Sequence, residues 1–188
     1  MTFPYYTKGG CLAFLYRQDS EYDAYSTKVK EIAASGIYVL FKPLLKRKKI
    51  WLVYEKFCSM AQDNGYYFFK YCMENLSDEE KKNIYYVIDK KAPDYEKIKE
   101  YDDHIIQFMS LKHVLYVLAA VLYVASDSRT HLYAWRCKTS LIRSKIDKRP
   151  IFFLQHGVTA LKQVGPLFGR KGSSPMTYFA TTSKFEQD

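Results

Sequence analysis

Residues 151–162 read Ile-Phe-Phe-Leu-Gln-His-Gly-Val-Thr-Ala-Leu-Lys, the pattern of a buried strand that runs out into a loop. The four apolar or aromatic residues lie between Pro150 and Gly157 and have the length and composition of such a strand. His156 would lie at the strand end, where open α/β sheets bind ligands. Gly157 permits a tight turn, and Lys162 adds a cation near an imidazole that exchanges protons around neutral pH. The stretch is therefore a candidate site for an anionic substrate, although a histidine satisfied by hydrogen bonds at a strand end fits the spacing as well.

The pattern around this strand repeats along most of the chain. Apolar segments typical of strands lie at residues 50–54, 84–88, 104–109, 121–125, 151–154 and 177–180. Helical patterns lie between them at residues 64–75, 93–101, 111–120 and 130–142. Strands that alternate with helices imply right-handed crossovers and a parallel sheet covered on both faces. The sequence therefore predicts an α/β, Rossmann-like domain over residues 50–188.

Residues 1–49 precede this pattern and form a separate segment in our interpretation. We expect a strand at residues 11–16 and one or two helical pieces within 23–45 that end near Pro43. A basic run follows between apolar residues and consists of Lys46, Arg47, Lys48 and Lys49. Such a run could dock on an anionic membrane leaflet, or it could be a solvated loop before the first sheet strand.

Composition limits the class of protein. The formal net charge of +9 favours anionic partners, and the 18 Tyr and 12 Phe provide abundant aromatic surface. The four cysteines are scattered, so we expect no disulfide framework and no structural zinc site. We also expect no other metal and no cofactor. We find no signal-peptide pattern and no apolar stretch of membrane-spanning length, which favours a soluble or surface-attached cytoplasmic protein. A nucleic-acid binder would explain the charge, but the basic residues are dispersed and no nucleic-acid motif occurs, so we expect no nucleic acid partner.

Polar residues gather where predicted strands end. The segment after residue 125 could cap the next helix and create an anion site at its N-terminus, and it consists of Ser126, Asp127 and Ser128. Arg129 and Arg136 suit bidentate contacts to phosphate, although two surface arginines beside a capped helix would look the same. Asn64 and Gly65 open another predicted helix and could either cap it or approach a ligand closely.

Taken as an ordered set from about residue 50 onward, four motifs resemble those of a known family. They are residues 51–55, residues 61–66 leading to 69–71, residues 126–129 with 131–133 and 135–136, and residues 153–157 with Lys162. The set is similar to the CDP-glycerol glycerophosphotransferases, the bacterial teichoic acid polymerase and primase family. Residues 177–188 also resemble the stretch that leads from the first domain of that family towards its second.

The resemblance implies a GT-B type transferase of two Rossmann-like domains with the active site between them. The N-terminal domain faces the acceptor, and the C-terminal domain holds most of the CDP-glycerol or related CDP-polyol donor. The family transfers glycerol phosphate or another polyol phosphate to a lipid-linked teichoic acid acceptor in cell wall biogenesis, peripherally on the inner, cytoplasmic face of the membrane. His156 matches the histidine that is the family's proposed general base. From charge alone, we assign Arg129, Arg136 and Lys162 to acceptor or transferred phosphate.

The chain also departs from the family pattern. It stops where the second domain would begin, so the resemblance implies an acceptor-side half that is inactive alone. A membrane-surface module without catalysis remains the alternative, because the basic run and its apolar neighbours would bind a leaflet without any help from His156.

Overall fold

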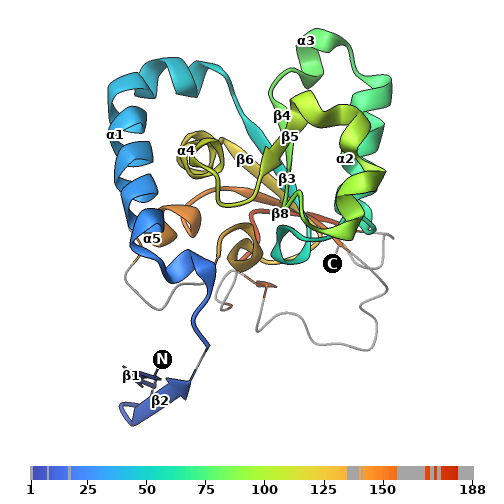
Figure 1. Ribbon diagram of the computed structural model, residues 1–188. Coiled ribbons are helices and arrows are strands. Elements are labelled where there is room, and N and C mark those ends of the chain that lie inside the picture. Colours follow the sequence, from blue (N-terminus) through green and yellow to red (C-terminus); the bar gives the residue numbers. More distant parts are fainter. Residues whose placement is uncertain are drawn as a thin grey trace.

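The structure, a computed structural model, describes residues 2–7, 9–16, 18–134, 140, 142–155, 168–169, 172 and 175–181. Its centre is a parallel sheet of six strands (Figure 1), namely β3 (Trp51–Tyr54), β4 (Ile84–Ile88), β5 (Ile105–Gln107), β6 (Leu122–Ala125), β7 (Ile151–Leu154) and β8 (Tyr178–Ala180). Their spatial order is β5-β4-β3-β6-β7-β8. If the strands of this sheet are numbered in chain order, with β3 as strand 1, the spatial order is 3-2-1-4-5-6. This is the order of the doubly wound Rossmann fold. The predicted α/β class and parallel sheet are confirmed.

The central strands are apolar throughout because both faces of the sheet are covered. In β3, Leu52, Val53 and Tyr54 are fully buried. Leu52 and Tyr54 pack into the core on one face, and Val53 packs into the core on the other. The alternation of side chains along a single strand thus contributes to two separate cores.

Helices lie on both faces of the sheet (Figure 1). One face carries α1 (Tyr25–Arg47), α4 (Leu111–Ala119) and α5 (Arg143–Ile146), and the other carries α2 (Asn64–Asn75), followed by the short α3 (Asp78–Lys81). Ser110 caps α4, since its hydroxyl accepts the N–H of His113 at 3.1 Å. Phe69, Cys72 and Met73 form the buried stripe of α2. The strands at residues 84–88 and 151–154 and the helix at 64–75 have the predicted bounds.

Helix α1 continues through Pro43 to Arg47, so the prediction that it ends near Pro43 is wrong. Proline removes one backbone hydrogen bond and crowds the preceding turn, and the helix kinks at Phe41 (φ −105°, ψ 15°) instead of stopping. Ala34 and Leu45 of α1 are buried in the same core as α4 and the sheet. That core therefore extends across the boundary that we placed at residue 49.

Short elements complete the described chain. Strands β1 (Thr2–Tyr6) and β2 (Leu12–Tyr16) pair as an antiparallel hairpin that lies away from the main sheet in Figure 1, and β2 confirms the strand expected at residues 11–16. Two segments each form a single turn of 3₁₀ helix, namely η1 (Glu21–Asp23) and η2 (Lys56–Cys58). The helix predicted at residues 93–101 is instead two 3₁₀ segments, η3 (Pro93–Lys97) and η4 (Lys99–His104).

The α-helix predicted at residues 130–142 is wrong over its described part. Residues Arg129–Leu132 form a single 3₁₀ turn, η5, and Tyr133 is extended (φ −139°, ψ 141°). The Tyr133 hydroxyl donates to the buried carboxylate of Glu31 at 2.9 Å, and Ser140 donates to the same oxygen at 2.8 Å. This segment therefore bonds to α1 rather than to its own backbone, and α5 begins only at Arg143.

Candidate functional site

The carboxyl ends of the six parallel strands meet at one edge of the sheet, and polar residues follow several of them. Glu55 follows β3, Asp89 follows β4, Ser126 follows β6 and Gln155 follows β7. Between β3 and β6 the strand order reverses, and this is where doubly wound sheets open a crevice for ligands. His156 is the next residue after Gln155, and together with Gly157, Lys162 and Arg136 it lies outside the described residues.

Asn64 connects two of the predicted site segments. Its side-chain amide donates to the backbone carbonyl of Gln155, so the start of α2 lies against the end of β7. At Gly65, an added Cβ would lie 3.0 Å from Cγ of Glu55 and 3.2 Å from the carbonyl oxygen of Tyr54. Glycine is therefore needed here for close packing of α2 on the end of β3, and a ligand contact at Gly65 stays a prediction.

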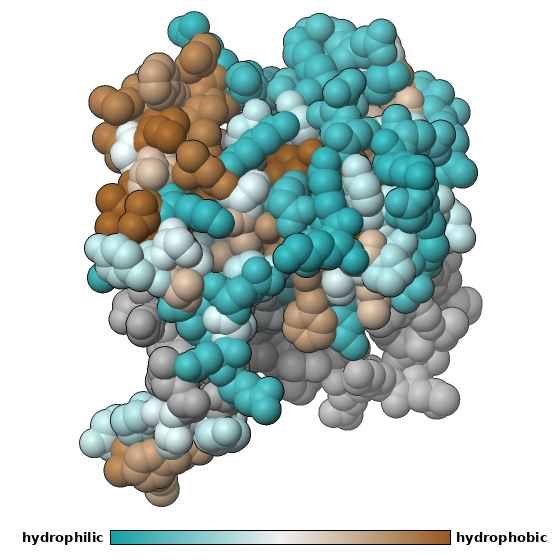
Figure 2. All heavy atoms as spheres, viewed as in Figure 1, coloured by the Kyte–Doolittle hydropathy of each residue, from teal (hydrophilic) through white to brown (hydrophobic). Residues whose placement is uncertain are grey.

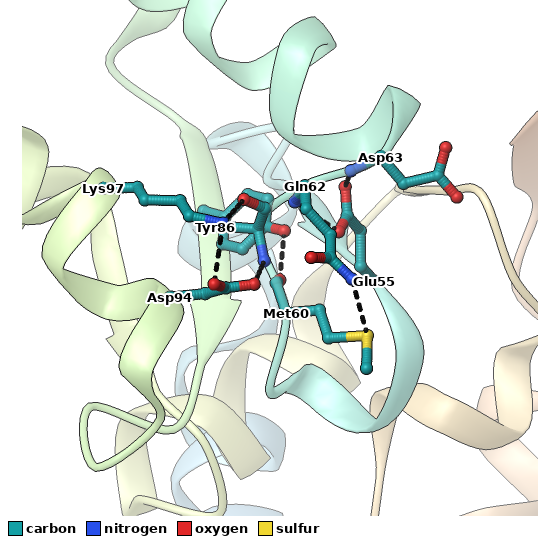
Figure 3. Close-up of polar contacts among 8 residues, drawn as sticks. Glu55, Met60, Gln62, Asp63, Tyr86, Asp94 and Lys97 are labelled. Carbon is teal, nitrogen blue, oxygen red and sulfur yellow. Dashed lines mark hydrogen bonds and ion pairs between the residues drawn. The ribbon is translucent and has the colours of Figure 1, made fainter.

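Glu55 is a site residue to which sequence reasoning gave no role of its own. Its buried carboxylate accepts three backbone N–H groups at the start of α2, those of Gln62 at 3.0 Å and Asp63 at 2.9 Å (Figure 3) and that of Tyr66 at 2.7 Å. Burial raises the pKa of Glu55, and the three N–H groups oppose that shift. Nucleotide-binding sheets use the helix N-terminus after the first strand for phosphate, but here the chain fills that position with its own carboxylate.

The loop between β3 and α2 is also held from its other side (Figure 3). Asp94 accepts the N–H of Ala61 at 2.9 Å and forms an ion pair with Lys97 at 2.7 Å. Burial alone would raise the pKa of Asp94, but Lys97 and that N–H together hold it below its usual value. The Tyr86 hydroxyl donates to the Met60 carbonyl at 2.7 Å. The loop beside the crevice is therefore preorganised by side chains from β4 and η3.

The segment after β6 does not cap an α-helix as predicted. Ser126 is buried, the N–H of Ser128 bonds to Oδ1 of Asp127 at 2.7 Å, and a single 3₁₀ turn follows. A four-residue 3₁₀ turn stands in place of the regular helix on which the predicted anion site was based, and an anion contact at these residues stays a prediction. Ser126, Asp127 and Ser128 nevertheless lie at the switch point, because the Tyr54 hydroxyl of β3 donates to the Ser128 carbonyl at 3.3 Å.

Arg129 is nearly buried, and its guanidinium contacts protein groups. Nε donates to the carbonyl of Arg149 at 3.0 Å, Nη2 donates to Oγ1 of Thr177 at 3.2 Å, and Nη1 donates to the carbonyl of Pro175. Burial lowers the pKa of Arg129. The side chain thus joins the end of β6 to the segment before β8, and its predicted phosphate contact stays a prediction.

His131 lies at the switch point, within the motif at residues 131–133, and sequence reasoning assigned it no role. Its Nδ1 accepts the backbone N–H of Phe57 at 3.2 Å, and its Nε2 lies 3.5 Å from Oδ1 of Asp127. Burial lowers the pKa of His131 while Asp127 opposes the shift, which favours a neutral ring with its proton on Nε2. The ring lies 4.3 Å from that of Phe57, centroid to centroid.

The backbone beside His131 adopts an uncommon conformation. Phe57 and Cys58 have φ values of 56° and 51°, in the left-handed region that residues other than glycine rarely adopt. The backbone N–H of Asp89 donates a hydrogen bond to the Cys58 carbonyl at 2.7 Å and so stabilises this turn. Strained residues of this kind concentrate at functional sites, and Phe57 lines a cavity of about 290 Å³.

The basic run lies at the opposite, amino edge of the sheet. Lys46, Arg47, Lys48 and Lys49 are all exposed. Figure 2 shows apolar surface gathered over α1, where exposed side chains include Val39, Leu40, Phe41 and Leu44. A groove of about 540 Å³ adjoins the run and includes Arg47, Lys48 and Trp51 in its wall. In the part of the chain that the structure describes, no helix is both long and apolar enough to span a membrane, and no His, Cys, Asp and Glu group is arranged to hold a metal ion.

Comparison with known proteins finds a relative that is a teichoic acid biosynthesis protein. Over 135 residues, 69% of this chain, the sequence is 30% identical to the minor teichoic acid biosynthesis protein GgaB of Bacillus subtilis (strain 168). The matched region spans only 14% of the length of GgaB. No family model matches the chain. No solved structure matches it either. The chain is thus similar, over most of its length, to a part of a teichoic acid biosynthesis protein.

Proposed function

We propose that this chain forms the acceptor-side, N-terminal domain of a GT-B type transferase of teichoic acid synthesis. The reaction would move glycerol phosphate, or another polyol phosphate, from a CDP-linked donor to a lipid-linked acceptor. The observation that carries the proposal is the 30% identity to GgaB over 69% of the chain. The 3-2-1-4-5-6 strand order, with polar residues gathered at its switch point, supports a ligand-binding role for the same domain.

His156 is the general base in this proposal. It takes a proton from the acceptor hydroxyl, whose oxygen forms a bond to the donor's β-phosphorus while the bond to CMP breaks and CMP leaves with the electron pair. A positioned base typically contributes about 10² to 10⁴ in rate. The preceding residue, Gln155, is buried, and its backbone carbonyl accepts a hydrogen bond from Asn64. The backbone immediately before the proposed base is therefore anchored to the start of α2. Arg136 and Lys162 are the proposed phosphate ligands, with Arg129 as a third.

Glu55 supports an acceptor role over a donor role. The CDP-linked donor carries two phosphates, and the start of α2 is where a sheet of this kind would normally bind them. The carboxylate of Glu55 occupies those N–H groups and would repel a phosphate placed there. The donor would therefore be held mainly by another domain, as the resemblance implies.

The proposal is tested by exchanging the matched stretch. A GgaB protein of Bacillus subtilis in which this chain replaces the matching region is produced in cells that lack GgaB, and minor teichoic acid in the wall is measured. In parallel, transfer of labelled glycerol phosphate from CDP-glycerol to a lipid-linked acceptor is assayed with the chimera. We expect polymer and transfer with the chimera, and a loss of about 10²-fold or more with His156→Ala.

His104→Ala is the matched control. The Nδ1 atom of His104 lies 3.0 Å from the Ile84 carbonyl at the start of β4, away from the carboxyl edge, so activity should be retained. A folded chimera that makes neither polymer nor product contradicts the proposed function. A chimera that stays active with His156→Ala contradicts only the assignment of the base.

A second candidate function, docking on a membrane surface, is favoured by α1. Leu40 is 76% exposed and Val39 is 70% exposed, next to four exposed basic residues. Exposed apolar side chains beside cations match the acyl boundary and headgroups of an anionic leaflet. This function is compatible with the first, because a peripheral transferase must reach a lipid-linked acceptor.

Sedimentation of the chain with vesicles tests this docking. We expect binding to vesicles that contain phosphatidylglycerol, weaker binding in high salt, and little binding to phosphatidylcholine alone. Lys46→Ala with Lys48→Ala should weaken binding by about 2 kcal/mol, or about 30-fold. Leu40→Asp should weaken it further, whereas Tyr71→Asp on α2, where the residue is also largely open to solvent, should not. Equal binding to neutral vesicles, or binding unaffected by these changes, would contradict docking through α1.

A further inference from the structure

The cavity of about 290 Å³ beside His131 has no assigned ligand. Its wall is formed by segments that follow four neighbouring strands, with Phe57 after β3, Asp89 after β4, Phe108 after β5 and His131 after β6. It thus opens at the carboxyl edge of the sheet, at the reversal of strand order where ligands bind in this architecture. Its volume lies at the lower end of the range for small-ligand pockets, suited to a single small unit.

The wall is rich in aromatic side chains. Tyr22 and Tyr133 line it with Phe57 and Phe108, and Phe57 is 60% exposed. Ser20, Ser59 and Thr130 also line the cavity, and their hydroxyl groups already bond to Asp23, Lys56 and Ser128, respectively. An aromatic wall with a few hydrogen-bonding groups binds a ligand that has both an apolar face and a polar rim.

The charge of the cavity distinguishes it from a phosphate site. Asp89 is the carboxylate in its wall, His131 is held neutral, and the described lining includes no lysine or arginine. A phosphate would lack a cation here and would face a carboxylate. A neutral ligand rich in hydroxyl groups would instead donate hydrogen bonds to Asp89.

The wall is also rigid before any ligand binds. Oδ1 of Asp89 accepts the N–H of Lys91 at 3.0 Å and Nε2 of Gln107 at 3.1 Å, so the carboxylate is held in one orientation. Tyr22 and Phe108 pack edge to face at 5.6 Å between centroids. Phe57 is fixed by its left-handed backbone and by its N–H bond to His131. Such preorganisation lowers the entropic cost of binding.

We propose that this cavity binds one neutral sugar ring of the acceptor. A pyranose presents C–H groups on its face, which would pack on Phe57 and its aromatic neighbours, and hydroxyl groups at its rim, which would bond to Asp89 and the cavity hydroxyls. The assignment of the sugar to an acceptor rests on the proposed transferase function. The sugar site itself rests on the cavity alone.

Saturation-transfer NMR with the 188-residue chain tests the site, with glucose and N-acetylglucosamine as probes and glycerol and glycerol 3-phosphate, whose C–H protons report binding of a phosphate, as comparisons. We expect signal transfer to a sugar and none to glycerol 3-phosphate. Phe57→Ala and Asp89→Asn should each raise the dissociation constant of that sugar about tenfold. Tyr71→Ala, an aromatic truncation on the exposed surface of α2, should leave it unchanged. If Phe57→Ala fails to fold by circular dichroism, Thr130→Val on the exposed rim replaces it.

The outcomes separate this site from the proposed transferase. Sugar binding that needs Phe57 and Asp89, in a chain whose GgaB chimera is inactive, supports the sugar site and contradicts the transferase. An active chimera with no sugar binding to the chain, and with an unchanged acceptor KM on Phe57→Ala, overturns the sugar site and leaves the transferase standing. Binding of glycerol and sugars with equal affinity also overturns it, because a linear polyol has no ring face for the aromatic wall.

Discussion

At the scale of single residues, His113 is a titratable group buried in the core. Its Nδ1 accepts the N–H of Met109 at 3.1 Å, and its ring stacks on Tyr133 at 6.0 Å between centroids. Burial lowers the pKa of His113 from 6.5 to about 3, with the Leu132 carbonyl opposing the shift only in part. The ring is therefore neutral in the folded protein over the whole physiological range.

This shift predicts a loss of stability in mild acid. The folded pKa lies below the unfolded one, so the unfolded chain binds more protons between pH 3 and 6.5, and stability falls as pH drops below about 6.5. Between pH 7.5 and 5.5 the contribution of His113 should fall by about 1.4 kcal/mol. His131, also with a lowered pKa, acts in the same direction, whereas Glu55, with a raised pKa, acts in the opposite direction.

Urea unfolding of the wild type and of His113→Asn across this pH range isolates the effect. Asparagine can accept the Met109 N–H without titrating, so the variant should be less stable at pH 7.5 but should lose about 1.4 kcal/mol less on acidification. An identical pH dependence in both proteins would contradict the assignment to His113.

Single residues also mark where sequence reasoning reached its limit. The end of β7 could be predicted because Pro150, four apolar residues and Gly157 are adjacent in the chain. The contact of Phe57 with His131 joins residues 74 positions apart, and that of Asn64 with Gln155 joins residues 91 apart. Such pairs are set by strand order and packing, which leave no local signal in one sequence.

At the scale of elements, two glycines in helices should respond in opposite ways to the same change. Gly36 lies on the exposed side of α1, and an added Cβ would meet no atom within 4 Å. Gly36→Ala should therefore stabilise the protein by about 0.5 to 1 kcal/mol, because alanine loses less backbone entropy in a helix. Gly65→Ala would press against Glu55 and the Tyr54 carbonyl, and should destabilise the protein by about 1 to 3 kcal/mol.

Urea unfolding gives the free energy of unfolding of the two variants, and each variant serves as the control for the other. Equal destabilisation by the two changes would mean that helix propensity is not the main term at Gly36. No loss with Gly65→Ala would mean that α2 can move away from β3 without cost.

Elements with a strong period were predictable, and those set by side-chain bonds were not. The 64–75 helix has a buried stripe at helical spacing, so its period alone defines it. The segment after β6 has the composition of a helix, but Tyr133 and Ser140 bond to Glu31 of α1 instead. Tertiary contacts there override local propensity.

At the scale of the whole molecule, the sequence predicted the fold class and the parallel sheet but not the strand order. Alternating apolar and helical segments require βαβ crossovers, and their handedness limits the possible topologies. Nothing in one sequence states that β3 lies between β4 and β6, and this placement creates the crevice with its cavity. The crevice could therefore be expected, but its lining could not be identified.

The basic run and the crevice lie at opposite ends of β3. Lys49 lies two residues before this strand and Glu55 directly after it, with five residues, Ile50–Tyr54, between them, of which the last four form the strand. At about 3.3 Å per residue, the strand separates the two by about 13 Å or slightly more. A protein resting on a leaflet through Leu40, Leu44 and the basic run would hold its reactive edge clear of the lipid by that height. The lipid headgroup itself would then lie too far from this edge to react. Acceptors would be selected by length, because only a chain long enough to extend from the leaflet to the far edge of the sheet could reach it.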